Sequence, residues 1–158
     1  MGGKNVYQEN VLSLDVAMKA MEAMLQEAAK DPTRPFAIAI VDNRGELICL
    51  ARQDGAQAFR TEMAIKKAYT AAQFRRSTRD QQDKAFKPEG LDLSMFNLGS
   101  KFTVLGGGVP IMKPEEDAKE VGQWRDLCGA IGTSGARQAE DERIAYVGLK
   151  VIRDILNL

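Results

Sequence analysis

Histidine is absent from the 158 residues of this chain. Its absence excludes a Ser-His-Asp triad, a Cys-His nucleophile, an imidazole zinc site and a haem held by a proximal histidine. Cysteine is nearly absent too, with only Cys49 and Cys128, which lie far apart in apolar surroundings. Such residues are typical of buried reduced thiols. They are too few for a zinc site and indicate a reducing cytoplasm as the compartment.

An excess of charge of either sign is also missing. Lys and Arg number 22, Asp and Glu number 22, and 28% of the residues are charged. A nucleic-acid or anionic-membrane binder normally has a basic excess, so we expect neither partner. No apolar run approaches the length of a membrane span, and residues 1–5 contain no apolar segment of a signal peptide. The length and composition predict a single domain over residues 1–158 with a sizeable core.

The hydrophobic pattern predicts helices and strands in an order that favours an α+β fold. Apolar residues recur at helical spacing in 11–30, 61–74 and 138–156. Residues 36–41 and 46–52 indicate a β-hairpin, 102–105 a third strand and 124–131 a fourth, which ends at the glycines of 132–135. Residues 75–90 predict either a short helix or a mobile connector. Because no βαβ repeat is present, an antiparallel sheet with helices packed on it fits best.

Four stretches carry a more specific pattern, and their order matters as much as their composition. They are VDNRGEL (41–47) with RQDGA (52–56), KKAYTAA (66–72) with RRST (75–78), GGGVPI (106–111), and GAIGTSG (129–135) with Asp141 and Glu142. Together they resemble the GlcG/HbpS family, which includes haem-binding HbpS proteins and the C-terminal domain of PduO. The resemblance extends from about residue 13 to 155.

The resemblance implies a profilin-like fold, an antiparallel sheet flanked by helices, assembled as a homo-oligomer. It also implies haem binding in some members and a link to corrinoid metabolism in one branch. Residues 112–128 are longer than the short turn typical of the family. We expect this excursion to reshape a pocket mouth or a subunit interface.

Two glycine-containing stretches are candidate ligand sites. Gly106, Gly107 and Gly108, followed by Pro110, either form a nest of N–H groups for an anion or make a tight bend that only glycine tolerates. Ser134 stands just before the last predicted helix, where it either helps to bind an anion or caps that helix.

Charged residues supply the other candidates. Arg52 either holds a carboxylate with its guanidinium fork or pairs with Asp54. Lys67 has mostly small neighbours, so we expect it to be partly buried, either as a ligand cation and base or as a surface lysine. Asp54 and Lys67 are the candidate catalytic residues for moving a proton. Asp141 and Glu142 indicate first-turn helix charges.

Two functions stand ahead of the others. The first is a haem or tetrapyrrole binder in which Met, Cys, Tyr, Lys, a hydroxyl or water replaces histidine as the iron ligand. The second is a cofactor-independent lyase, hydrolase or isomerase acting on a carboxylated metabolite, with Arg52, Lys67, the 106–108 loop and Ser134 binding the acid. A non-catalytic accessory subunit is a third. No metal site is expected; the weakest alternative is a carboxylate cluster of Asp42, Asp54, Asp141 and Glu142.

Overall fold

The computed structural model describes residues 6, 9–86, 101–113 and 126–158. The elements follow one another as α1 (Leu14–Ala28), β1 (Ala37–Asp42), β2 (Leu47–Arg52), α2 (Ala58–Phe74), α3 (Thr78–Ala85), β3 (Gly108–Met112), β4 (Leu127–Ser134) and α4 (Gln138–Leu156). The described strands form a four-stranded sheet in the order β2-β1-β4-β3, with every neighbouring pair antiparallel. The predicted α+β class is confirmed.

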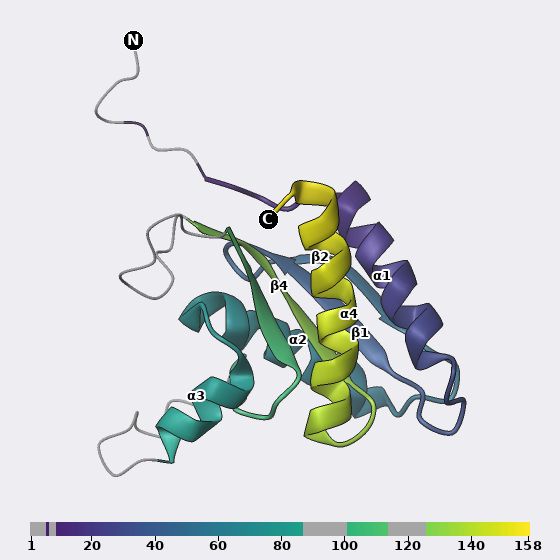
Figure 1. Ribbon diagram of the computed structural model, residues 1–158. Helices are drawn as coiled ribbons and strands as arrows, with labels where there is room; N and C mark the ends of the chain where they lie inside the picture. Colours follow the sequence, from purple (N-terminus) through teal and green to yellow (C-terminus); the bar gives the residue numbers. More distant parts are fainter. Residues whose placement is uncertain (1–5, 7–8, 87–100, 114–125) are drawn as a thin grey trace.

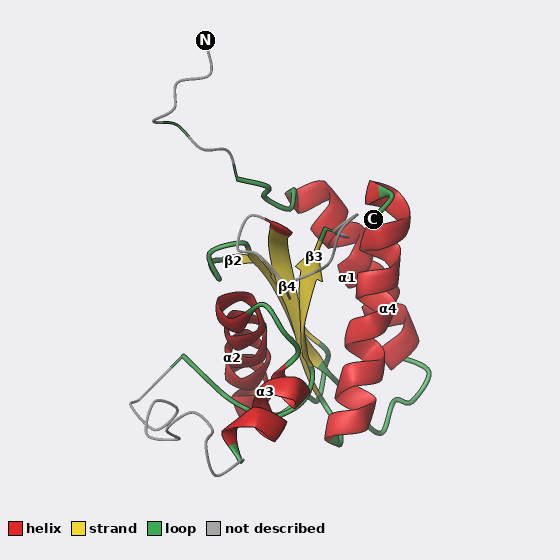
Figure 2. Ribbon diagram, turned by 60° about the vertical axis from the view of Figure 1, so that its left-hand side comes forward, coloured by secondary structure: helices red, strands yellow, loops and turns green. Residues whose placement is uncertain are grey.

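Helices cover both faces of the sheet (Figures 1 and 2). On one face α1 and α4 pack over Ile38, Ile40 and Ile131, which all have no exposed surface. On the other face α2 packs over the small side chains of Ala39 and Ala130. The uninterrupted apolar run at 36–41 is typical of a strand that is covered on both faces. β1 is buried on both faces, as this pattern predicts.

α2 lies so close to the sheet that only glycine fits where its backbone meets β3 and β4. A Cβ at Gly132 would be 2.5 Å from the Ala68 backbone nitrogen and would overlap the carbonyl of Ala64. Gly108 on β3 faces the Lys67 carbonyl in the same way. The backbone of α2 therefore rests directly on β3 and β4, a contact that no larger residue permits.

The third and fourth strands differ from the prediction. Residues 102–105 are not a strand: the Thr103 N–H donates to the side chain of Thr70 at 2.9 Å, and the Phe102 ring packs 5.3 Å from that of Tyr69. These contacts bind the segment to α2 instead of to a β-ladder. The glycines 106–108 therefore precede β3, whereas the sequence pattern predicts that they follow a strand. β4 also continues through Ser134, beyond the predicted end.

The helices agree better with the prediction. α4 has the predicted bounds, and α1 lies within the predicted 11–30, capped by Ser13, whose Oγ accepts the Val16 N–H at 3.3 Å. α2 begins at Ala58, three residues before the predicted start at residue 61, and ends at Phe74 as predicted. In residues 75–90 the short-helix alternative is correct for α3, which Ser77 caps; residues 87–90 lie outside the described part. Most of the excursion at 112–128 also lies outside it.

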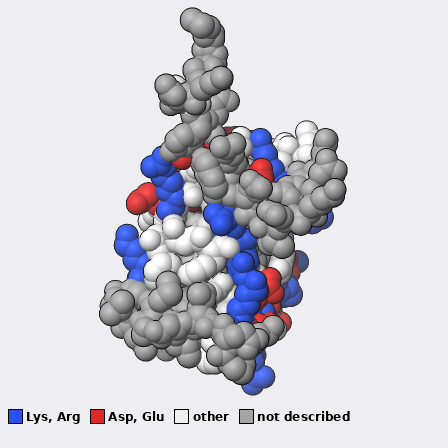
Figure 3. All heavy atoms as spheres, turned by 90° about the vertical axis from the view of Figure 1, so that its left-hand side faces the viewer, with Lys and Arg blue, Asp and Glu red and all other residues white. Residues whose placement is uncertain are grey.

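The surface carries both signs of charge. The face shown in Figure 3 has Lys and Arg side chains beside an uncharged area, with acidic side chains among them. None of the described helices is both long enough and apolar enough to cross a membrane.

Burial disfavours ionisation of both thiols. Cys128 is buried, as predicted, whereas Cys49 is only half-buried, and neither is in a disulfide. Burial raises the pKa of the Cys49 thiol to about 11 and also raises the pKa of Cys128. Neither thiol is therefore appreciably ionised at neutral pH.

This shift predicts slow alkylation. At about pH 8 we expect iodoacetamide to modify Cys49 roughly 100-fold more slowly in native protein than in urea-unfolded protein, because the thiolate population falls with the raised pKa. Mass spectrometry of quenched samples measures both rates. Equal rates in the two states would contradict the buried environment of Cys49.

Candidate functional site

Lys67 lies on the sheet-facing side of α2 and is buried. It follows Ala64 by three residues and precedes Ala71 by four, so it belongs to the buried stripe of the helix. Its Nζ donates to Asp141 Oδ2 at 2.7 Å and to the Thr133 carbonyl at 2.9 Å. Only 3% of its side chain is exposed. The expected partial burial is therefore exceeded, and the ammonium group already has an internal carboxylate.

Asp141 is the second member of this buried pair. It stands in the first turn of α4, as predicted, but it is buried and not solvated. Its Oδ1 accepts the N–H groups of Gly135 at 3.0 Å and Ala136 at 2.8 Å, so one carboxylate joins α2 to the turn before α4. Burial lowers the pKa of Lys67, while the nearby Asp141 acts in the opposite direction.

The glycine loop closes over the pair. Gly107 has a φ of +122°, and a Cβ there would be 3.1 Å from Lys67 Nζ and closer still to the Thr133 carbonyl. The N–H groups of Gly106 and Gly108 donate to Gln138 Oε1 at 2.7 Å and Thr78 Oγ1 at 3.0 Å. The loop's glycines thus serve close packing, and the N–H groups of Gly106 and Gly108 are used inside the protein.

Three of the remaining predicted residues, Arg52, Asp54 and Ser134, lie at this same end of the sheet. Ala37 is paired with Arg52 on one side and with Ser134 on the other, so both side chains share one sheet face. Ser134 is buried, whereas Arg52 and Asp54 are exposed. No ion pair joins Arg52 to Asp54 among the described residues. The ligand and catalytic roles assigned to these residues and to Pro110, an interior residue of β3, stay predictions.

Away from this site, two surface hollows are lined entirely by described residues. The larger, about 570 Å³, runs along the outer face of α1 and is lined by Met18, Met21 and Leu25 with charged side chains at its edges. We call it the α1 groove. Met18 is 49% exposed, whereas Met21 belongs to the core. Lys19, beside Met18, pairs with Asp15 at 2.9 Å.

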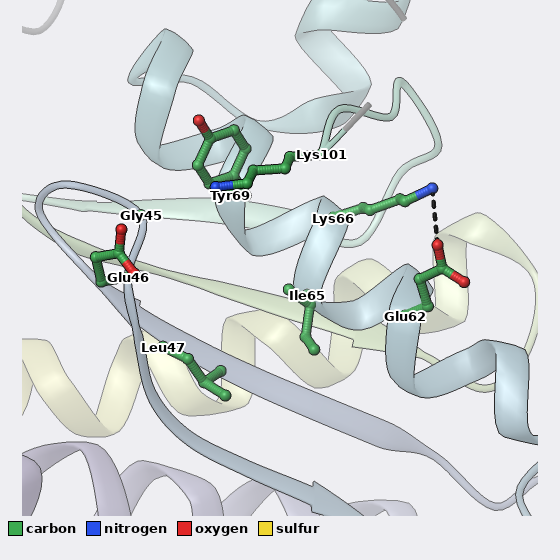
Figure 4. Close-up of a pocket in the computed structure, with 8 residues that line it drawn as sticks. All are labelled: Gly45, Glu46, Leu47, Glu62, Ile65, Lys66, Tyr69 and Lys101. Atoms are coloured by element: carbon green, nitrogen blue, oxygen red, sulfur yellow. Dashed lines mark ion pairs between the residues drawn. The ribbon is translucent and has the colours of Figure 1, made fainter. Parts of the chain in front are cut away.

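The smaller hollow, about 340 Å³, lies between the β1–β2 turn and α2. We call it the hairpin pocket (Figure 4). Leu47 and Ile65 form its apolar wall, and Lys66, Tyr69 and Lys101 line it from above in the view of Figure 4. The pocket has an amphipathic lining assembled from three separate segments of the chain.

Both hollows contain residues that the sequence pattern did not single out. Met18 is apolar but lies outside the buried helical stripe of Val16, Ala20 and Met24. This position in the helical period is the sequence feature that could have predicted an outward-facing side chain. Lys66 and Tyr69 belong to the same KKAYTAA stretch as Lys67 but project from another side of α2. In the sequence nothing connects them to Lys101.

Carboxylates do not gather for a metal. In the described part of the chain, no group of three or more Cys, Asp or Glu side chains is arranged to hold an ion. Asp42 instead stabilises the hairpin turn, where its Oδ1 accepts the N–H groups of Arg44 at 2.8 Å and Glu46 at 3.0 Å. The carboxylate-cluster alternative is therefore wrong for these residues.

The chain is thus an α+β domain in which helices cover both faces of a four-stranded antiparallel sheet, and the Lys67–Asp141 pair is buried within it. The family model described as haem-degrading protein HbpS-like matches residues 12–150, and the chain belongs to this family. This match confirms the family resemblance that the four sequence stretches indicate.

Two curated relatives share part of the sequence. An uncharacterised 15.0 kDa protein of the dhaT-dhaS intergenic region of Citrobacter freundii is 26% identical over 141 residues, 88% of this chain and 91% of that protein. The corrinoid adenosyltransferase PduO of Salmonella typhimurium is 28% identical over 128 residues, 80% of this chain. This match spans only 34% of PduO, about a third of its length.

Solved structures share the fold. Klebsiella pneumoniae ORFY has a TM-score of 0.81 at 19% identity, covering 94% of this chain and 95% of its own. A double mutant of Streptomyces reticuli HbpS has a TM-score of 0.76 at 27% identity, covering 96% and 93%. The PduOC–haem complex has a TM-score of 0.73 at 24% identity, covering 89% and 94%.

Proposed function

We propose that this chain binds haem or a related tetrapyrrole in the α1 groove. Membership of the haem-degrading HbpS-like family over residues 12–150 is the observation that carries the proposal. The 27% identical Streptomyces HbpS supports it at the level of the whole chain. The place of binding is argued from the iron ligands and hollows of this chain.

The available iron ligands favour Met18. The chain has no histidine, and both thiols have a raised pKa, so neither is a ready thiolate. Thioether sulfur is an established axial ligand of haem iron. Met18 is half-exposed and lies in the larger hollow, so its sulfur is within reach of a bound macrocycle. The donor set therefore fits a haem held through sulfur.

The hairpin pocket fits a macrocycle less well. Its volume of about 340 Å³ lies near the lower end of the range of about 300–1,000 Å³ for small-molecule pockets. The Tyr69 hydroxyl also points away from Leu47 and Ile65, so it does not present a phenol to the pocket interior (Figure 4). The tetrapyrrole is therefore assigned to α1.

The α1 groove supplies an apolar bed and one cation, Lys19, beside the two acids Asp15 and Glu22. Leu14, one turn before Met18, is 58% exposed, and Leu25 continues the apolar lining. Among the described residues Lys19 is paired with Asp15 alone, in an exposed ion pair worth at most about 1 kcal/mol, so it can turn to a propionate at little cost. Bound haem would supply redox-active iron.

The test is a haemin titration followed in the Soret band. We expect saturable binding, and we expect Met18→Leu to weaken it by at least about tenfold, because leucine keeps the apolar contact but removes the sulfur. Met63→Leu, the same change at a half-buried methionine of α2, is the matched control and should bind as the original chain does.

Two outcomes would count against the proposal. The absence of a saturable Soret change in the original chain would refute tetrapyrrole binding. Equal affinities for Met18→Leu and the original chain would refute the assigned ligand. The enzyme alternative is not favoured by the geometry, because Lys67 is enclosed with Asp141 and Asp54 is exposed at the end of the hairpin.

A further inference from the structure

We propose that the hairpin pocket is a second ligand site, which takes a small carboxylate with an apolar or aromatic body. This inference stands apart from tetrapyrrole binding, since it uses the opposite face of the sheet and none of the α1 residues. It rests on the charge arrangement, the apolar wall and the rigidity of the pocket.

Of the two lysines that line the pocket, Lys101 has no carboxylate partner among the described residues. Lys66 Nζ is 3.1 Å from Glu62 Oε1, so these two residues neutralise each other at one end (Figure 4). At the other end Lys101 Nζ lies 5.3 Å from the centroid of the Tyr69 ring. Among the described residues no carboxylate lies within ion-pair distance of Lys101. A carboxylate entering the pocket would find its counter-ion there.

A cationic ligand fits this arrangement less well. The face of the Tyr69 ring, which would attract an ammonium group, already carries the Lys101 ammonium. Of the two pocket carboxylates, Glu62 is engaged by Lys66, and Glu46, an exposed residue of the turn, has no ion pair among the described residues. The lining charges therefore balance over the whole pocket, and an anion is favoured locally, beside Lys101 at the Tyr69 ring.

The apolar wall determines the chemistry expected for the rest of the ligand. Leu47 from β2 is 47% exposed, and Ile65 from α2 is half-buried beside it. Figure 4 shows both side chains below the two lysines, away from the ion pair. A ligand with its carboxylate at Lys101 would lay its hydrocarbon part against these two side chains. The volume of about 340 Å³ suits a compact molecule.

The pocket is held open before any ligand arrives. Gly45 has a φ of +87°, and a Cβ there would lie 2.7 Å from the Tyr69 ring, so glycine lets the turn pass the ring without displacing it. Gln73 Nε2 donates to the Arg44 carbonyl at 2.8 Å and ties the turn to α2. Tyr69 also packs on Phe102. Such preorganisation lowers the entropic cost of binding.

The test is an NMR titration of amide signals with three probes of one shape. These are 4-phenylbutanoate, the uncharged 4-phenylbutanamide and the cationic 4-phenylbutylamine. We expect 4-phenylbutanoate to bind saturably with roughly millimolar affinity and to shift signals of residues 45–47 and 62–69. The amide and the amine should bind more weakly.

Two variants make the test specific. Lys101→Gln should weaken 4-phenylbutanoate binding by about fivefold and abolish the preference over the amide, because it removes the cation from an exposed site. Lys84→Gln, at an exposed lysine of α3, should have no effect. Shifts confined to α1, equal binding of the three probes, or unchanged binding in Lys101→Gln would each overturn the proposal. Haemin affinity of Lys101→Gln separates this site from the α1 groove, because only the latter should retain its ligand.

Discussion

Replacing Asp141 by alanine is expected to lower the free energy of unfolding by about 3–5 kcal/mol. The substitution leaves the Lys67 ammonium, 97% of whose side-chain surface is covered, with only the Thr133 carbonyl as a close acceptor. It also leaves the N–H groups of Gly135 and Ala136 without the carboxylate that accepts them. The large effect arises from these unpaired buried groups and not from the value of an isolated ion pair.

Asp154→Ala is the matched control for this experiment. Asp154 pairs with Lys150 at 2.6 Å, but both side chains are largely exposed, so we expect a loss of about 0–1 kcal/mol. The double variant Lys67→Met/Asp141→Leu should recover part of the stability lost in Asp141→Ala, because it buries no lone charge. Urea unfolding monitored by circular dichroism measures all three. Equal losses for Asp141→Ala and Asp154→Ala would contradict the buried pair.

Gly132→Ala is expected to cost at least about 1–3 kcal/mol of unfolding free energy. The added methyl group would meet the Ala64 carbonyl and lie 2.5 Å from the Ala68 nitrogen. Both are backbone atoms of α2, so no side-chain rotation relieves the overlap and the helix must move away from β4. The same urea unfolding experiment measures the loss.

Gly148→Ala is the control for this second prediction. A Cβ at Gly148 would lie 2.5 Å from Met24 Sδ, a flexible side chain that can move, and alanine is favoured over glycine in a helix by about 1 kcal/mol. We therefore expect a smaller loss than for Gly132→Ala. A Gly132→Ala variant as stable as the original chain would show that α2 does not rest directly on the sheet.

The sequence was sufficient to predict elements that depend on residues close together in the chain. α4 is delimited by its apolar stripe, and the β1–β2 hairpin by a turn with Gly45 between two strands. The third strand was placed too early because Phe102, in an apolar stretch, packs on the aromatic side chains of α2. Such packing has no signature in a window of a few residues.

The candidate residues show the same limit. The position of Lys67 among alanines indicated burial, but its partners lie 66 and 74 residues further along the chain. Whether an enclosed lysine is free or paired depends on that distant contact. Likewise the hairpin pocket needs Leu47, Ile65 and Lys101 from three segments, and only the fold brings them together.

The most direct test of tetrapyrrole binding on α1 is an NMR titration with gallium(III) protoporphyrin, a diamagnetic substitute for haem. Its ring current shifts the signals of the residues that it covers. We expect saturable shifts at Met18, Met21 and Leu25, with the signals of residues 45–47 unchanged. Shifts confined to the hairpin pocket, or no saturable shift at all, would contradict the proposed function.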